Sequence, residues 1–386
     1  MIGVVCLNPA LDITHHVPVV DWAGVNRPHE VATRPGGKGV NVARALLTLG
    51  AEVLVIGLTG GATGEALTAG LAAHGVPSEL TPIAGETRRT FAVRDEARQT
   101  VAMFNEAGPQ VRAAEFSEFL ISFKRLLTAS EALVLSGSLP PGLPADTYAT
   151  LIRMAGATRP APPLSHTTPS GLTTATGHID HSDPKNPADP TRSFSRISHS
   201  SPTAGVPVVL DAHGEALRLG AAAGPAVVKP NLAELEDLAA GPLSLAGEGT
   251  GRPTVASAAA ELRAAGAGSV VVSLGPAGLY ADTPAGSWRA ASAPVEAANP
   301  TGAGDAVTAG LVLGLVRGQP WPDRLRDAAA LGTAAVLAPV AGEFRPDDYR
   351  RMVAGVTLTE VTPARYGSAG RAERGGHAGQ GNGDAG

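Results

Sequence analysis

Short apolar runs alternate with longer amphipathic segments through most of the chain. The runs have the length of β-strands and are Val53–Leu58, Ala132–Ser136, Val206–Asp211, Ala226–Lys229 and Ser269–Leu274. The segments between them have helical spacing and include Val40–Leu49, Gly64–His74, Asp146–Ala155, Leu232–Ala239 and Val255–Ala265. Because strands that are apolar throughout are buried on both faces, this alternation predicts an α/β fold with a mostly parallel sheet covered by helices. Ligands are then expected at the carboxyl ends of the strands.

Two parts of the chain mix polar and apolar residues at strand-like spacing instead. They are Asp12–Val20 with Val25–Thr33, and Thr90–Asn105. Strands of this kind have one face in water. We therefore expect a small exposed antiparallel sheet, built from about residues 12–35 and 88–106, that acts as a lid over the main domain of residues 1–360. The alternative is a set of surface hairpins without a gating role.

Residues 157–204 break the alternating pattern, because Pro, Ser, Thr and His dominate there. Such a segment cannot bury enough apolar surface to order itself, so we predict a disordered insertion. His178 and His181 have a spacing that could bind a metal, but no Cys or acidic cluster supports a site, and solvated histidines are the better interpretation. The tail 364–386, rich in Gly and Ala, is also predicted to be disordered.

The composition excludes several classes of function. The 386 residues carry a net charge of −5 without a basic run, so no nucleic-acid partner is expected. No apolar segment approaches ~20 uncharged residues without Gly or Pro, so no membrane span is expected. The only cysteine, Cys6, excludes an internal disulfide framework and fits a reducing cytoplasm. Since Cys6 lies in an apolar run, it is predicted to be a buried structural thiol.

The loop Asn299–Asp305 leads directly into the apolar segment 306–315. A proline followed by small residues predicts a tight turn that opens a buried helix, whose first free N–H groups carry partial positive charge. Gly302 and Gly304 allow an anion to approach this backbone, and Asp305 places one carboxylate in the first turn. An anion site beside a lone carboxylate suits phosphoryl transfer to a hydroxyl. Alternatively, Asp305 only caps the helix.

The turn Gly36–Asn41 reads Gly-Gly-Lys-Gly-Val-Asn. It is not a P-loop, because Ala32 and Gly39 occupy positions where that motif needs Gly and Ser or Thr. Lys38 instead offers a positive charge to an anionic substrate, and Asn41 can donate to and accept from sugar hydroxyls. A solvated lysine in a flexible turn is the alternative.

Three further motifs favour a sugar phosphate. Asp12 follows the first strand and could accept hydrogen bonds from vicinal hydroxyls, or be an ordinary turn aspartate. Ser138 lies in a loop of hydroxyls and glycines after a strand, which is either a contact loop or simply a turn. Arg88 and Arg89 could bind a phosphate in a bidentate manner, or be surface charges.

Two more motifs favour a nucleotide and a metal. Asn231 and Glu234 share one face of a helix start and could hold a metal-bound water and a phosphate. The same spacing also describes a capping box. The Gly-rich turn Ser273–Tyr280 closes an apolar strand where a nucleotide could approach the backbone, although such a turn alone is weak evidence.

Taken in order, these motifs resemble the PfkB family of carbohydrate kinases, which have the ribokinase-like fold. The resemblance covers roughly residues 1–340, apart from the insertion, and it implies a three-layer α/β/α domain with a small β-sheet lid. Within the family the chain is most similar to the 1-phosphofructokinases, with tagatose-6-phosphate kinases and 6-phosphofructokinases next. A non-catalytic protein that binds sugar phosphates is the alternative from another class.

The resemblance also implies a role for each motif. Asp305 would be the general base, and the backbone N–H groups of Gly302, Ala303 and Gly304 would form the anion hole. The phosphosugar would be held by Asp12, Gly37, Lys38, Asn41, Arg88 and Ser138. The ATP site would contain Lys229, Asn231, Ser273, Gly275, Gly278 and Gly304. Glu234 would hold Mg²⁺ through a water.

The sequence departs from the family pattern at two places, in one strand and in the insertion between Ala155 and Gly205, which falls in a helix-to-strand connection and should leave the fold unchanged. Arg89 and Thr90 stand where related phosphosugar kinases commonly have an apolar residue and Asn, so the sugar contacts of this strand are expected to differ. The resemblance implies ATP as co-substrate and a homodimer formed through the lid strands.

Overall fold

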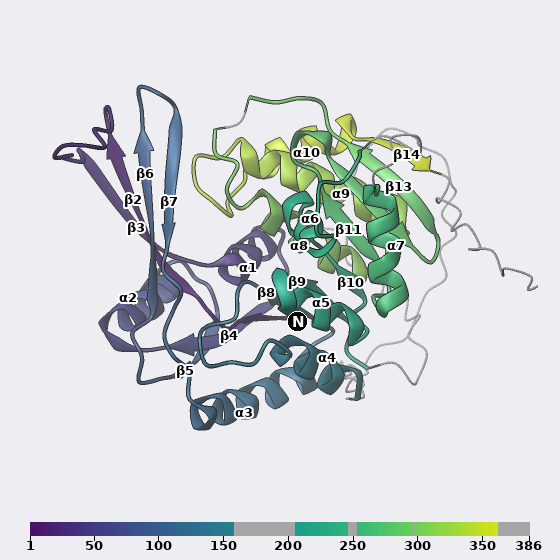
Figure 1. Cartoon of the computed structure of the whole chain (residues 1–386), viewed down its shortest axis with the longest axis horizontal. Helices are drawn as coiled ribbons and strands as arrows, with labels where there is room; N and C mark the ends of the chain where they lie inside the picture. The colour runs from purple at the N-terminus through teal and green to yellow at the C-terminus, as the bar shows by residue number, and fades with distance from the viewer. Residues whose placement is uncertain (158–204, 246–252, 297, 362–386) are drawn as a thin grey trace, which may run out of the picture.

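A ten-stranded sheet forms the centre of the fold, in a computed structural model that describes residues 1–157, 205–245, 253–296 and 298–361 (Figure 1). In spatial order its strands are β14 (Thr357–Val361), β13 (Gly286–Ala291), β12 (Leu279–Thr283), β11 (Val270–Ser273), β10 (Val227–Val228), β9 (Val208–Asp211), β8 (Ala132–Ser136), β1 (Ile2–Cys6), β4 (Val53–Thr59) and β5 (Ser78–Pro82). Every pairing from β11 to β5 is parallel, whereas β12, β13 and β14 add an antiparallel edge. The predicted mostly parallel sheet is confirmed.

Helices cover both faces of this sheet because successive strand residues point to opposite sides. Val4 of β1 packs into the cluster beneath α1 (Lys38–Thr48), α2 (Gly61–Ala73), α8 (Ala303–Val316) and α9 (Trp321–Val336), with α10 (Pro346–Gly355) beside α9. Val5 packs into the opposite cluster beneath α3 (Ala113–Ala129), α4 (Thr147–Ala157), α5 (Gly214–Ala222), α6 (Leu232–Leu238) and α7 (Val255–Ala265). Every residue of β1 and β8 is buried, as expected for strands covered on both faces.

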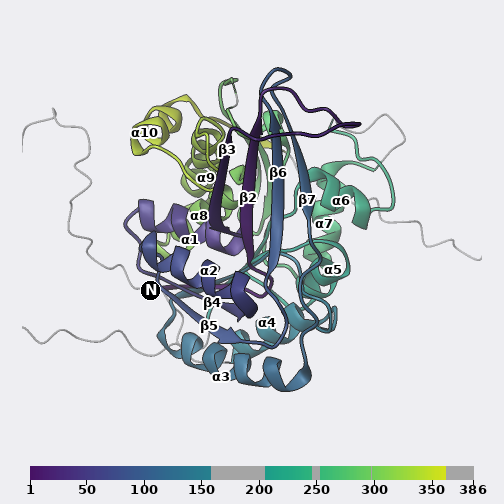
Figure 2. The same ribbon diagram turned by 90° about the vertical axis from the view of Figure 1, so that its left-hand side faces the viewer.

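A second sheet, of four strands, projects from one side of the main domain (Figures 1 and 2). Its order is β3 (Glu30–Gly36), β2 (Ala10–Val17), β6 (Arg88–Asp95) and β7 (Thr100–Asn105). The two outer pairings are antiparallel, as expected for this small sheet, but the central pairing of β2 with β6 is parallel, which was not expected. The reason lies in the main sheet, where β1 and β5 run in the same direction. The chain therefore enters β2 and β6 from the same side.

Most predicted elements lie within a few residues of the observed ones. The strand predicted at Val25–Thr33 is instead β3, which begins at Glu30. The helix after the Asn299–Asp305 loop begins at Ala303, so Asp305 does lie in its first turn. Residues 158–204 and 362–386, on which the predictions of disorder fall, lie outside the described residues. Among the described helices, none combines the length and apolar character needed to cross a bilayer.

Candidate active site

A cleft of about 1540 Å³ opens at the carboxyl ends of the parallel strands, and residues of the small sheet, such as Asp12 and Arg88, form part of its lining. All predicted site residues except Glu234 line this cleft, and Glu234 contacts the cleft residue Lys38. The lining therefore brings together motifs from the two ends of the chain, as expected where ligands bind at the carboxyl ends of strands.

The anion loop, Asn299–Asp305, ends at the N-terminus of α8 with Gly302 at φ 84°. A Cβ on Gly302 would lie 2.4 Å from the backbone nitrogen of Gly342, so both the dihedral angle and the close approach require glycine here. The Gly302 carbonyl accepts the first helical hydrogen bond, from Ala306 N–H at 3.0 Å. Gly302, Ala303 and Gly304 all line the cleft, where this helix N-terminus favours an anion, and the Ala303 N–H also makes a long hydrogen bond of 3.5 Å to the Pro300 carbonyl.

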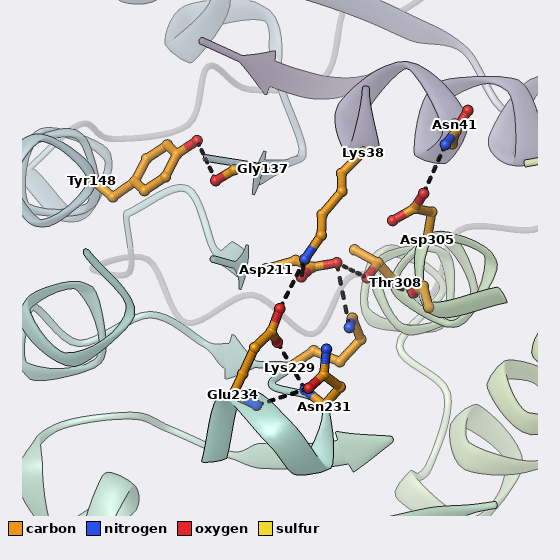
Figure 3. A network of polar contacts seen from close by, with 11 residues as sticks. Lys38, Asn41, Gly137, Tyr148, Asp211, Lys229, Asn231, Glu234, Asp305 and Thr308 are labelled. Carbon is orange, nitrogen blue, oxygen red and sulfur yellow. Dashed lines mark hydrogen bonds and ion pairs between the residues drawn. The ribbon is translucent and has the colours of Figure 1, made fainter. Parts of the chain in front are cut away.

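Asp305 lies in this first turn and is only 6 % exposed. Its Oδ2 accepts a hydrogen bond from Asn41 Nδ2 of α1 at 2.9 Å (Figure 3). Burial and, after it, the nearby charge of Asp211 raise the pKa of Asp305 to about 7, against the lowering effects of Lys38, Asn41 and Lys229. A carboxyl with this pKa exchanges a proton near neutral pH, which is what general-base catalysis needs.

Asp211, at the end of β9, is fully buried in the floor of the cleft. Its Oδ1 lies 3.1 Å from Lys38 Nζ, and its Oδ2 lies 3.3 Å from Lys229 Nζ and 3.1 Å from Thr308 Oγ1 (Figure 3). Burial alone would raise the pKa of Asp211, but the charges of Lys229 and Lys38 hold it below its ordinary value. Asp211 therefore stays ionised and fixes both lysines.

Lys38 is shared between two carboxylates rather than free in a turn. Its Nζ lies 3.1 Å from Asp211 Oδ1 and 3.1 Å from Glu234 Oε1. Burial lowers the pKa of Lys38, yet the charges of Asp211 and Glu234 raise it above its ordinary value overall. The interpretation of Lys38 as a solvated lysine is therefore wrong, because most of this side chain is covered and its charge is paired.

The capping box and the polar site proposed for Asn231 and Glu234 coexist in the structure. Glu234 Oε2 accepts from Asn231 N–H at 2.9 Å, and Asn231 Oδ1 accepts from Glu234 N–H at 2.8 Å. The second oxygen of Glu234 is turned to Lys38. Carboxylate oxygens of Asp211 and Glu234 thus both face the ammonium group of Lys38. Hard oxygen donors of this kind also fit Mg²⁺ held partly through water.

The end of the cleft beside the small sheet carries residues that were predicted to bind the phosphosugar. Arg88 lines the cleft, and its Nε donates to the Asn8 carbonyl at 3.0 Å, whereas its neighbour Arg89 does not line the cleft and pairs with Glu106. Asp12 lines the cleft, and burial raises its pKa to about 6 against the lowering hydrogen bond of Thr90. Adjacent strand residues point to opposite faces, so only one of the two arginines can face the ligand.

The opposite end of the cleft carries the residues predicted for the nucleotide. Ser273 closes β11, and Gly275 and Gly278 follow it with φ 58° and 83°. A Cβ on Gly278 would lie 2.1 Å from the carbonyl oxygen of Ala290, so the turn can pass under β13 only without a side chain. Ser273, Gly275 and Gly278 all line the cleft, and the two glycines leave room there for a ligand to approach the backbone.

Four cleft or neighbouring residues were missed by the sequence reasoning: Asn8, Tyr148, Asp211 and Thr308. Asp211 carried a weak signal, since it is a carboxylate directly after a buried strand. Asn8 follows the first strand, four residues before Asp12, and its Nδ2 donates to Ser138 Oγ at 3.0 Å and to the Ala107 carbonyl at 2.9 Å. Tyr148 and Thr308 lie inside apolar helical segments and carried no signal.

The chain is similar to known carbohydrate kinases in sequence and in fold. The pfkB family carbohydrate kinase model matches residues 5–181 and 181–348. Phosphofructokinase-2 from Escherichia coli in complex with potassium shares 28% identity and a TM-score of 0.73, covering 92% of this chain and 98% of that one. A possible 1-phosphofructokinase from Thermotoga maritima shares 23% identity and a TM-score of 0.71, covering 94% and 100%. Ribokinase from the same organism shares 17% identity, with a TM-score of 0.62 and coverage of 92% and 99%.

The matched residues span most of the chain, and the neighbours include both phosphofructokinases and a ribokinase, so the ribokinase-like fold is confirmed. The chain therefore belongs to the pfkB family of carbohydrate kinases and is a phosphotransferase that acts on a sugar hydroxyl.

Proposed function

We propose that this kinase transfers the γ-phosphoryl group of ATP to a sugar that already carries a phosphate, with fructose 1-phosphate as its preferred acceptor. The products are then fructose 1,6-bisphosphate and ADP. The observation that carries the proposal is that Asp305, the anion loop that ends at it, and Arg88 all line one cleft. ATP as the donor follows from membership in a kinase family.

In this proposal Asp305 accepts the proton of the acceptor hydroxyl as that oxygen attacks the γ-phosphorus. Asn41 holds the carboxylate in place through the 2.9 Å hydrogen bond. The first N–H groups of α8, from Gly302 to Gly304, stabilise the negative charge on the phosphoryl group in transfer. Positioning and electrostatic stabilisation are the main contributions a protein makes to this reaction.

The lysines and carboxylates of the cleft organise the nucleotide phosphates. Lys229 Nζ lies 3.5 Å from where a Cβ on Gly304 would be, so its charge is beside the anion loop. Glu234, through a water, and Asp211 are the residues that would hold Mg²⁺ here. The bound ion would neutralise phosphate charge. Ser273, Gly275 and Gly278 would then face the nucleotide.

Arg88 is the feature that favours an acceptor with a phosphate over a free sugar. Its guanidinium borders the cleft near Ser138, since Asn8 contacts both residues. Asp12 and Asn41 would bind the sugar hydroxyls, and Gly37 and Lys38 would lie beneath the sugar. The small sheet would act as a lid that excludes water during the reaction.

Fructose 6-phosphate and tagatose 6-phosphate are the second candidates for the acceptor. Phosphofructokinase-2 from Escherichia coli, of which one structure is a complex with fructose-6-phosphate, is 28% identical to this chain. The possible 1-phosphofructokinase is 23% identical, a level at which it supports the fold alone. A non-catalytic role is disfavoured because Asp305, the glycines of the anion loop and the Asn231–Glu234 pair are all kept.

We also propose that the chain forms a homodimer through the small sheet. Val101 and Met103 of β7 are about half exposed, and the register places them on the same sheet face as Asp12 and Thr90. Exposed apolar side chains at the edge of a cleft commonly mark an interface. Sedimentation velocity would show a dimer for the natural chain and a monomer for Met103→Lys, and a monomeric natural chain would refute this proposal.

The acceptor is tested by measuring ADP release with fructose 1-phosphate, fructose 6-phosphate, tagatose 6-phosphate and fructose. We expect the highest kcat/KM for fructose 1-phosphate and a value about 10- to 150-fold lower for fructose, because a lost phosphate–arginine contact removes roughly 1.5–3 kcal/mol. Arg88→Ala should raise the phosphosugar KM at least about tenfold, whereas the matched control Arg89→Ala should leave it nearly unchanged. Equal use of fructose and fructose 1-phosphate would contradict the proposal.

A further inference from the structure

Tyr148 is a fully buried tyrosine on α4 whose hydroxyl group contacts the loop that follows β8 at the edge of the cleft. Its ring packs in the apolar cluster beneath the sheet, and its Oη donates to the Gly137 carbonyl oxygen at 3.1 Å (Figure 3). Burial raises the pKa of this phenol well above its ordinary value, so the group remains a hydrogen-bond donor at any working pH.

Gly137 is held by two hydrogen bonds, one on each of its peptide groups. Its N–H donates to the Asp211 carbonyl at 2.9 Å, and its carbonyl accepts from Tyr148. Gly137 has φ 106°, a conformation that strongly favours glycine. Because glycine resists rotation least of all residues, the orientation of the peptide group between Gly137 and Ser138 depends on these external contacts.

The contact with Tyr148 also decides where the next N–H group points. In a trans peptide the carbonyl and the following N–H point in opposite directions. Figure 3 shows the Gly137 carbonyl directed to Tyr148, on the side away from Lys38, so the Ser138 N–H is directed to the side of the cleft charges. Within the described parts of the chain, no acceptor is found for this N–H, although both Gly137 and Ser138 line the cleft.

We propose that Tyr148 is a positioning residue for the acceptor substrate. Its hydroxyl fixes the Gly137–Ser138 peptide so that the Ser138 N–H donates to an oxygen of the bound phosphosugar. Ser138 Oγ is held separately by Asn8 Nδ2, so the side chain and the backbone N–H of Ser138 are set by different partners. The inference rests on the proposed function, in which this end of the cleft holds the phosphosugar.

Tyr148→Phe tests the proposal, because it removes only the hydroxyl and keeps the ring that packs in the core. The matched control is Tyr280→Phe. Tyr280 belongs to the same apolar cluster and is 4% exposed, and its hydroxyl is hydrogen-bonded to Ser287 and does not line the cleft. We expect the phosphosugar KM of Tyr148→Phe to rise about three- to tenfold, the consequence of one weakened hydrogen bond. The KM for ATP should stay within about twofold, and the control should change neither constant.

A phosphosugar KM that shifts no more in Tyr148→Phe than in Tyr280→Phe would overturn the proposal, as would an equal rise in the KM for ATP. Adding Ser138→Ala, which keeps the N–H and removes Oγ, provides a second test. If Tyr148 acts through the N–H, the fold-changes of the two substitutions multiply, whereas a double variant no worse than Ser138→Ala alone would contradict this. A natural enzyme that uses no phosphosugar would refute the proposed function instead, and the same comparison would then be made with the acceptor it does use.

Discussion

Replacing Asp305 by Asn should make the protein more stable as well as inactive. The substitution removes one buried negative charge and keeps the oxygen that accepts the hydrogen bond of Asn41. Burial, together with the charge of Asp211, raises the pKa of Asp305 from 3.8 to about 7. At ~1.4 kcal/mol per pKa unit, this rise corresponds to a free-energy cost of roughly 4 kcal/mol for holding the charged carboxylate in the folded chain.

The sign of this change in stability follows from the pH range in which the folded and the unfolded chain each lose the proton of Asp305. Below about pH 4 the carboxyl is neutral in both the folded and the unfolded chain, so the substitution changes little. Between about pH 4 and pH 7 only the unfolded chain ionises, and the natural protein loses stability as the pH rises. Above pH 7 the full cost applies, and Asp305→Asn should be more stable by on the order of 4 kcal/mol.

Urea unfolding followed by tryptophan fluorescence at pH 5, 6, 7 and 8 measures this difference. Asp211→Asn is the matched control with the opposite sign, because the pKa of Asp211 is lowered and its charge holds Lys38 and Lys229. Its loss should cost about 3–5 kcal/mol at pH 7. An Asp305→Asn variant that gains no stability at pH 8, or gains as much at pH 5, would refute the reasoning.

Three other predictions follow from the same cleft and its surroundings. Lys38→Met should bind Mn²⁺ more tightly than the natural chain in the absence of nucleotide, because Asp211 and Glu234 lose the ammonium group that they share. Electron paramagnetic resonance of free Mn²⁺ measures this affinity, and an unchanged affinity would contradict the prediction. Gly302→Ala should lose activity and at least about 1 kcal/mol of stability, since its φ of 84° and a 2.4 Å backbone contact oppose a side chain; normal turnover would contradict this. The thiol of Cys6, whose pKa burial raises to about 11, should react with a thiol reagent at pH 8 only after unfolding, and rapid reaction of the native chain would contradict its burial.

The elements of the main domain are largely predictable because each carries its own local pattern. Ala132–Ser136 and Val255–Ala265 match β8 and α7 to the residue. The helix α7 begins after a Thr254 capping box and ends at Gly266 with φ 141°, so both of its limits are encoded in the residues beside it. The parallel pairing of β2 with β6 was not predictable from these strands alone, since it depends on the directions of β1 and β5 in the main sheet.

Some residues of the candidate site were predictable from a local sequence pattern, and others were not. Gly302 and Asp305 were identified because a glycine turn before an apolar helix is a local signal. Asp211 was missed because its importance comes from contacts with residues far away in sequence, such as Lys38 at a separation of 173 positions. The spacing of Asn231 and Glu234 could not decide between a capping box and a ligand site, because one oxygen of Glu234 serves the cap and the other faces Lys38.

The most direct test of the account is single-turnover phosphoryl transfer by Asp305→Asn at pH 8, with fructose 1-phosphate or the best acceptor found. If Asp305 is the general base, the rate of the chemical step should fall about 10³-fold while the affinity for ATP stays within about twofold. A variant that transfers the phosphoryl group within about tenfold of the natural rate would contradict the assignment of Asp305 as the base.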